Sequence, residues 1–240
     1  ACAFPLIKLG LADFGIAGTD TGGKALFAGA RFLLAGLVVL AVAKLCGRSF
    51  AVPRGKTRWQ LVLFGLVNTA LHYFFFYLGV SNSPGGRASI LDSLGTFLLI
   101  LAAAVVFREK LTLRSIFGCL LGFSGIVLIN LGSTAGQFTL SGDGMLLCSS
   151  VCAMAGGLLT RVVTRKMDPL VATGHSLALG GALLIPAGLL MGAHPVGVHL
   201  KGLLILAALV VVSAVGFSFY NQLLRYHPVG QIAIYNAFIP

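Results

Sequence analysis

Charged residues, and acidic residues above all, are scarce in this sequence of 240 residues: six are Asp or Glu and seventeen are Lys or Arg. Apolar residues make up 58% of the chain, and 32 further residues are glycine. In ordinary soluble domains these two groups together reach only about 45–50%. The chain therefore has too few polar side chains to cover a water-facing surface, which excludes a soluble globular domain.

Motifs of several functional classes are also absent. The five cysteines form no CxxC and no Cys/His ligand pattern, so neither a disulfide framework nor a metal site is predicted. No Walker A, HExxH or GxSxG sequence occurs, so nothing supports ATP-driven transport by this chain alone. The basic residues form no continuous face with interleaved aromatics, which argues against a nucleic-acid partner. We expect no cofactor and no catalytic residue.

Long apolar runs dominate what remains. Seven runs approach the 20 or so residues that a helix needs to cross a hydrocarbon core about 30 Å thick. They lie at 25–45, 61–80, 88–107, 115–132, 144–160, 169–192 and 202–224. Shorter apolar runs at 1–12 and 229–240 flank them, and we interpret both as helices cut by the ends of the sequence. The pattern predicts an all-α, multi-pass protein of the cytoplasmic membrane with about nine helices, the first and last incomplete.

The two halves of the sequence match weakly at an offset of 144 residues. Residues 84–92 fall on residues 228–236, and Arg31 falls on His175, so that helices 2, 3 and 4 land on helices 7, 8 and 9. Each unit then has five helices, and because five is odd, the second unit must cross the membrane in the opposite direction. This predicts a ten-helix bundle of two inverted five-helix repeats, an arrangement typical of secondary transporters with a binding site between the repeats.

Several short motifs keep the same phase as these helices. They are RFLLAGL at 31–37, GRASIL at 86–91, FREKLT at 107–112, Gly142 with Asp143, and Asn236 with Pro240. With these motifs the chain resembles the EamA-type permeases of the drug/metabolite transporter superfamily. The resemblance implies two EamA-type repeats at 1–132 and 142–240, truncated at both ends. It also implies a secondary transporter, not an enzyme, that moves small organic metabolites or amphipathic compounds by alternating access, with export the expected direction. Its partners would be the small-molecule substrate and the membrane lipids.

Four ionisable side chains lie inside the predicted spans at a similar depth, about 8–12 Å below the outer face at 1.5 Å per residue. They are Lys8, Arg31, His72 and Asp92. Asp92 is the only acid well inside a span, so we expect it to pair with Lys8 or Arg31, because a lone charge in hydrocarbon is costly. Two interpretations stay open: a polar floor that recruits a substrate headgroup or a proton, and an ion pair that holds helices together. If a proton is carried, Asp92 or His72 is the expected site.

Polar and aromatic side chains recur at helical spacing in the third and eighth helices. Asn68 and His72 are four residues apart, Tyr73 and Tyr77 follow on a neighbouring stripe, and Asn221 lies in the eighth helix. Rings with polar tips suit a cavity for amphipathic molecules, whereas an interfacial aromatic belt is the alternative for Tyr77. The residues predicted to line a substrate or translocation cavity are Lys8, Arg31, Asn68, His72, Tyr73, Asp92, Asn221 and Asn236.

Glycines four residues apart predict close helix packing in two places. One is Gly118 with Gly122 and Gly125, and the other is Gly188 with Gly192.

An enzyme is the alternative function. The letters GFSG at 122–125 and AH at 193–194 resemble the Ser and His segments of rhomboid-type intramembrane serine proteases, in which a His base activates the Ser. Ser124 lies in the middle of an apolar run and His194 in an external loop, and inverted repeats do not suit that fold. The protease is therefore the weaker hypothesis.

The distribution of basic residues predicts the orientation of the chain. Alternate connections hold twelve basic residues against three, Lys24, Arg87 and Lys201, and Lys and Arg in short loops stay on the cytoplasmic side. A cysteine placed at Ser49 in a cysteine-free background should therefore resist a membrane-impermeant thiol reagent added outside intact cells, whereas a cysteine within 133–143 should react. Labelling of the Ser49 position from outside would show the orientation to be wrong.

Overall fold

The structure, a computed structural model, describes residues 3–52, 55–109, 113–130, 137–193, 199–229 and 232, and in these ranges every regular element is helical. The elements are α1 (Ala3–Asp13), α2 (Thr21–Leu45), α3 (Lys56–Gly65), η1 (Leu66–Leu71), α4 (His72–Asn82), α5 (Gly85–Phe107), α6 (Leu113–Asn130), η3 (Leu140–Gly144), α7 (Met145–Thr164), α8 (Pro169–Leu190) and α9 (Leu200–Tyr226). Since α3, η1 and α4 form one rod and η3 leads into α7, these elements correspond to the first eight predicted helices. Six of the rods are long and apolar enough to cross a membrane. Of the ninth predicted helix, 229–240, only Val229 and Ile232 are described.

Side-chain caps decide where two central helices begin. Asp20 accepts a hydrogen bond from the Gly23 amide at 2.7 Å and starts α2. Asp168 caps α8 in the same way, with Pro169 at the first helical position. The cap makes α2 start four residues earlier than predicted, so Lys24, expected in a loop, lies buried in its first turn and donates hydrogen bonds to Gly18 and Ser81.

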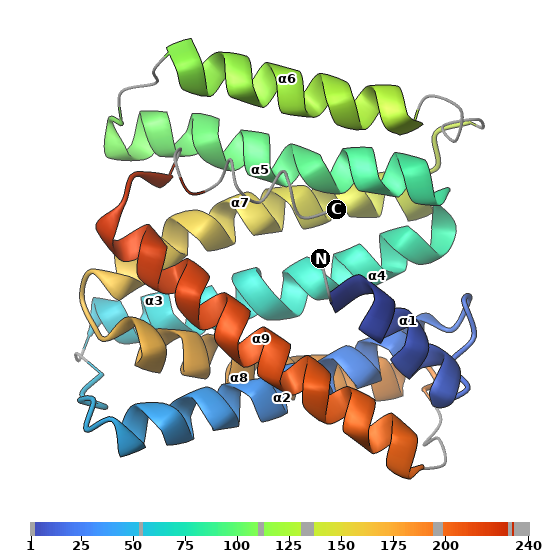
Figure 1. Cartoon of the computed structure of the whole chain (residues 1–240), viewed down its shortest axis with the longest axis horizontal. Helices are drawn as coiled ribbons and strands as arrows, with labels where there is room; N and C mark the ends of the chain where they lie inside the picture. Colours follow the sequence, from blue (N-terminus) through green and yellow to red (C-terminus); the bar gives the residue numbers. More distant parts are fainter. Residues whose placement is uncertain are drawn as a thin grey trace.

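Contacts between helices repeat in the two halves of the chain. In the first repeat α1 packs on α9, and in the second the corresponding α7 packs on α3, η1 and α4. Likewise α2 packs on α9, and the corresponding α8 packs on η1 and α3. Figure 1 shows α9 crossing obliquely over α2 and α8. The fold is therefore the predicted all-α bundle of two inverted repeats.

The backbones of α2 and α8 touch along a ladder of glycines. The ladder pairs Gly22, Gly29 and Gly36 on α2 with Gly188, Gly181 and Gly174 on α8. A Cβ added to Gly36 would lie 2.4 Å from the Ala178 nitrogen, and one added to Gly181 would lie 2.3 Å from the Leu33 nitrogen. Small residues permit such an approach where lipid supplies no hydrophobic drive between helices. The antiparallel pair α2–α8 makes the most extensive helix contact in the described residues.

Of the five glycines predicted to pack, the structure confirms one and contradicts three, and the surroundings of Gly122 lie outside the described part of the structure. Gly188 belongs to the ladder, but no described atom lies within 4 Å of a Cβ built on Gly118 or Gly125 of α6. Gly192 ends α8 in a left-handed turn with φ +84° instead of packing. The seven-residue spacing on α2 and α8, two helical turns, marked the real contact, whereas the four-residue spacing in α6 did not.

A second pair, α5 and α7, runs parallel and is joined at both ends by ion pairs. At one end Arg87 lies 2.9 Å from Asp143, a fully buried carboxylate that also accepts hydrogen bonds from Ser83 at 2.7 Å and the Thr139 amide at 2.9 Å. At the other end Arg161 pairs with Glu109. Because α5 belongs to the first repeat and α7 to the second, the two ion pairs fasten the repeats to each other.

The glycine ladder predicts a position-specific cost. Gly36→Ala should lower stability by about 1–3 kcal/mol, because the added methyl group meets backbone that cannot move aside. Gly216→Ala, on α9 with no atom of a described residue within 4 Å, should be neutral or stabilising by up to about 1 kcal/mol through helix propensity. Thermal unfolding of the purified variants in detergent measures both, and equal effects would contradict direct backbone contact.

The buried ion pair predicts a second contrast. Asp143→Asn removes the charge that compensates Arg87 and should destabilise the protein by about 3–5 kcal/mol. The same substitution at Asp168, whose partner Arg48 is 3.8 Å away and half exposed, should cost less than about 1 kcal/mol because Asn still caps the helix. Unfolding midpoints of the two variants compare them directly; a similar loss in both would show that the Arg87–Asp143 pair is not special.

Candidate functional site

The third rod contains a π-helical turn, η1, at its centre. Turns of this kind are rare and occur frequently at functional sites, because they displace the side chains that follow. Within η1, Thr69 reaches Ser176 of α8 at 3.3 Å, and Asn68 packs directly on Gly156 of α7. The π-helical turn thus packs against both α7 and α8, and His72 is the first residue after the turn.

Among the cations whose side chains are described, Arg31 is the most buried, with 5% of its surface exposed. Its Nε donates to the Ser213 hydroxyl of α9 at 2.8 Å, and its guanidinium lies over the Phe32 ring, 4.8 Å from the centroid. Its Nη1 is also buried, and no described group accepts a hydrogen bond from it. Since α2 begins at Thr21, Arg31 lies ten residues, about 15 Å, from that end. This is deeper than predicted and close to half of a 30 Å core.

Aromatic rings surround this guanidinium. The Phe32 ring lies 4.3 Å from Tyr73 and 6.0 Å from Phe217, centroid to centroid. Arg31 acts electrostatically on both Tyr73 and Tyr77. Tyr77 is 6% exposed and belongs to the core that α2, α8 and α9 share, so the aromatic-belt interpretation was wrong for it.

His72 and Asp92 belong to the same neighbourhood, with the His72 ring 4.7 Å from Tyr73, centroid to centroid. His72 Nδ1 is 3.1 Å from the Ser149 carbonyl oxygen and 3.2 Å from the Ser149 hydroxyl on α7. The Asp92 carboxylate interacts electrostatically with His72 and Tyr73. Among the described residues no ion pair joins Asp92 to Arg31, which corrects that part of the expected pairing. Both charges act electrostatically on Tyr73.

The remaining predicted site residues are not seen in contact with this cluster. Asn221, 2% exposed, donates to the Thr173 hydroxyl at 2.9 Å and so fastens α9 to α8. The backbone of Lys8 lies in α1, but its side chain is outside the described part of the structure, and Asn236 lies outside the described residues altogether. The structure therefore brings Arg31, Tyr73, His72 and Asp92 together, with Asn68 one turn below His72.

Sequence reasoning missed some of the residues that complete this cluster. Phe32 and Ser149 lie within apolar runs, where single hydroxyls and rings are too common to stand out. Ser213 and Phe217 lie four residues apart in the eighth helix, upstream of Asn221, but this spacing does not link them to Arg31, because the hydrogen bond from Arg31 to Ser213 joins residues 182 positions apart. What these groups can do together is hold a small molecule between rings while offering it hydrogen bonds from a guanidinium, an imidazole and phenols.

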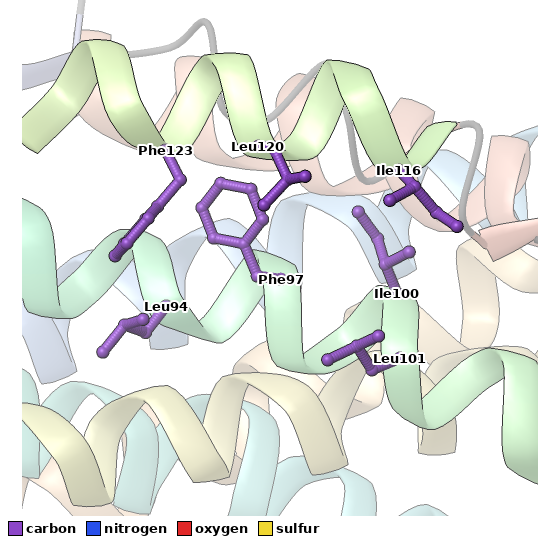
Figure 2. A pocket seen from close by; sticks show the side chains of 7 residues that line it. All are labelled: Leu94, Phe97, Ile100, Leu101, Ile116, Leu120 and Phe123. Atoms are coloured by element: carbon purple, nitrogen blue, oxygen red, sulfur yellow. The ribbon is translucent and has the colours of Figure 1, made fainter. Parts of the chain in front are cut away.

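An apolar pocket of about 260 Å³ lies elsewhere, between α5 and α6 (Figure 2). Its lining consists of Leu94, Phe97, Ile100, Leu101, Ile116, Leu120 and Phe123. Leu101 and Leu120 are more than half exposed, so the pocket lies at the lipid-facing edge of the bundle beyond α5 (Figure 1). With no polar side chain it cannot select a polar substrate, and we do not assign it to the site.

The protease alternative finds no support in the structure. Ser124 is exposed on α6, the helix at the edge of the bundle, and His194 lies outside the described residues.

Comparison with known proteins agrees with this fold. The model of the EamA-like transporter family matches residues 15–131 and 140–240. A chloroplastic WAT1-related protein of Arabidopsis thaliana is 30% identical over 162 residues, which cover 65% of this chain and 38% of that protein. An uncharacterized transporter of Synechocystis sp. is 28% identical over 185 residues, covering 69% and 54%. A probable terminal-alkyne amino-acid exporter of Streptantibioticus cattleyicolor is 24% identical over 186 residues, covering 78% and 59%.

The matched part of the chain thus spans between about two fifths and three fifths of the length of these relatives. A crystal structure of another protein superposes with a TM-score of 0.77 at 19% identity, covering 98% of this chain and 83% of that one, which shows the same fold. Together with the apolar spans and the two inverted repeats, the matches to both halves show that this multi-pass membrane protein belongs to the EamA-like transporter family.

Proposed function

We propose that the chain forms most of a secondary transporter that exports small organic or amphipathic metabolites by alternating access, with its repeats at 1–132 and 142–240. The observation that supports this most is the mid-depth cluster of Arg31, Tyr73, His72 and Asp92, which lies where helices of both repeats meet. Secondary carriers built from inverted repeats bind their substrates at this depth and at this interface. The name of the Streptantibioticus relative, a probable amino-acid exporter, supports export of a small polar organic molecule.

The contacts suggest which parts move. The glycine ladder joins α2 to α8 and the two ion pairs join α5 to α7, so each pair combines one helix from each repeat. We infer that these pairs, and not the sequence repeats, are the rigid bodies of the transport cycle. The rod α3–η1–α4 packs on α7 and α8 and is also in contact with α2 and α5, and its π-helical turn is a natural place for it to flex.

Proton coupling is a further part of this proposal. Asp92 and His72 interact electrostatically inside the membrane span, and each can change its charge. Asp92→Asn copies the repeat-related residue Asn236 and keeps a polar side chain of the same shape. We therefore expect it to reduce assembly or transport less than Asp92→Ala does.

Alternating access predicts reciprocal exposure of the two sides of the cluster. In a cysteine-free, full-length protein, cysteines at His72 and Asn221 should change their reactivity toward a water-soluble thiol reagent in opposite directions when a transported metabolite is added. His72 lies ten residues from the end of α4 at Asn82, and Asn221 lies near the opposite end of the bundle in the last turns of α9. The metabolite is chosen by comparing what cells with and without the full-length protein release. If the metabolite increased the reactivity of both cysteines at once, the result would contradict a carrier and favour a channel.

A further inference from the structure

We propose that Arg31 binds the carboxylate of the transported molecule, so that the substrate is an organic monoanion with an apolar or aromatic body. The inference rests on the proposed transport function and specifies its substrate class. It starts from one feature, a guanidinium held in the middle of the bundle that keeps an unused hydrogen-bond donor.

Hydrogen bonding within the protein uses only part of this guanidinium. Arginine has five N–H donors in a planar fork. Nε is taken by Ser213 at 2.8 Å, while the buried Nη1 has no acceptor among the described residues. Leaving a buried charged donor unsatisfied is costly, so a site that keeps one is prepared for a group that arrives with acceptors. A carboxylate fits the fork better than any neutral acceptor, because it accepts two parallel N–H bonds.

No acid of this sequence neutralises Arg31. All six acidic residues are described, and none forms an ion pair with Arg31. Asp13 pairs with Lys201, Asp20 and Asp168 cap helices, Asp92 interacts with His72 and Tyr73, Glu109 pairs with Arg161 and Asp143 pairs with Arg87. One uncompensated positive charge at this depth is expensive in hydrocarbon. A single negative charge on the substrate would balance it, which favours a monoanion.

The rings beside Arg31 indicate the rest of the molecule. Phe32, Tyr73 and Phe217 meet with centroid distances of 4.3 and 6.0 Å, and His72 lies 4.7 Å from Tyr73. Side chains of this kind stack on flat or apolar groups and place polar tips at the edges. A compound with a carboxylate one or two bonds from a ring would contact both the guanidinium and the aromatic wall.

Binding of three matched probes to the purified full-length protein tests this proposal. Phenylacetate is the anion, phenylacetamide its neutral counterpart and 2-phenylethylamine the cation on the same ring. Isothermal titration in detergent at neutral pH should show saturable binding of phenylacetate, with the amide and the amine weaker by roughly tenfold or more, as expected for a charge-assisted bond. Arg31→Gln should bind the acid no better than the amide, and Arg31→Lys should keep part of the preference.

Lys24→Gln is the matched control, because Lys24 is a second buried cation on the same helix, seven residues away, whose ammonium already donates to Gly18 and Ser81. It should bind phenylacetate like the unmodified protein, and size-exclusion profiles check that every variant is folded. If Arg31→Gln does not fold, Arg31→Lys and the three probes on the unmodified protein decide. The proposal is overturned if the unmodified protein shows no saturable binding of phenylacetate or prefers the amine, or if the preference for the acid survives Arg31→Gln or disappears equally in Lys24→Gln.

Binding in detergent does not require transport, so the two proposals fail separately. A preference for the anion without reciprocal cysteine exposure would leave the carboxylate site intact and reject the carrier. Reciprocal cysteine exposure with a preference for the cation would support the carrier and reject the carboxylate site.

Discussion

Direct contact between the backbones of α2 and α8 is the constraint on which the rest of this fold depends. Lipid tails are as apolar as leucine, so these helices gain little from burying large side chains and instead approach through glycine. The approach places Arg31 and Phe32, on one side of α2, against α9, and brings Thr173 of α8 within reach of Asn221. A bulkier ladder would separate the two helices and, with them, the groups that meet at the centre.

Polar groups in this protein occupy two kinds of place. At the ends of the spans, Arg87 pairs with Asp143 and Arg161 pairs with Glu109, and these ion pairs fasten helices of different repeats together. Polar groups at mid-depth are incompletely satisfied, with a free donor on Arg31 and a carboxylate on Asp92 that forms no ion pair among the described residues. An open donor at mid-depth agrees with the proposed function, because a binding group keeps hydrogen-bonding capacity for its ligand.

Much of the fold could be predicted from the sequence, because span length, charge placement and an odd-numbered repeat leave few arrangements in a bilayer. The boundaries were less accurate: the Asp20 cap lengthened α2 and buried Lys24, which had looked like a loop residue. For the site, ionisable residues in the middle of the membrane could be singled out, since such groups are rare there, and the structure brings three of the four, Arg31, His72 and Asp92, into one cluster with Tyr73. Their partners could not be predicted, because Arg31 meets Ser213 and His72 meets Ser149 on helices far apart in the sequence, and the spacing along one helix does not show such contacts.

Composition and pattern alone determined that this chain crosses a membrane several times as two inverted helical units, since water cannot cover so apolar a chain and hydrocarbon accepts only helices or closed barrels. The tertiary structure decided which charges neutralise one another. Six acids could be shared among seventeen cations in many ways, and only the distances between helices separate the ion pairs of the described residues from Arg31, which meets no acid. Charge pairing depends on a few ångströms between residues far apart in the chain, and no periodicity in a sequence encodes that.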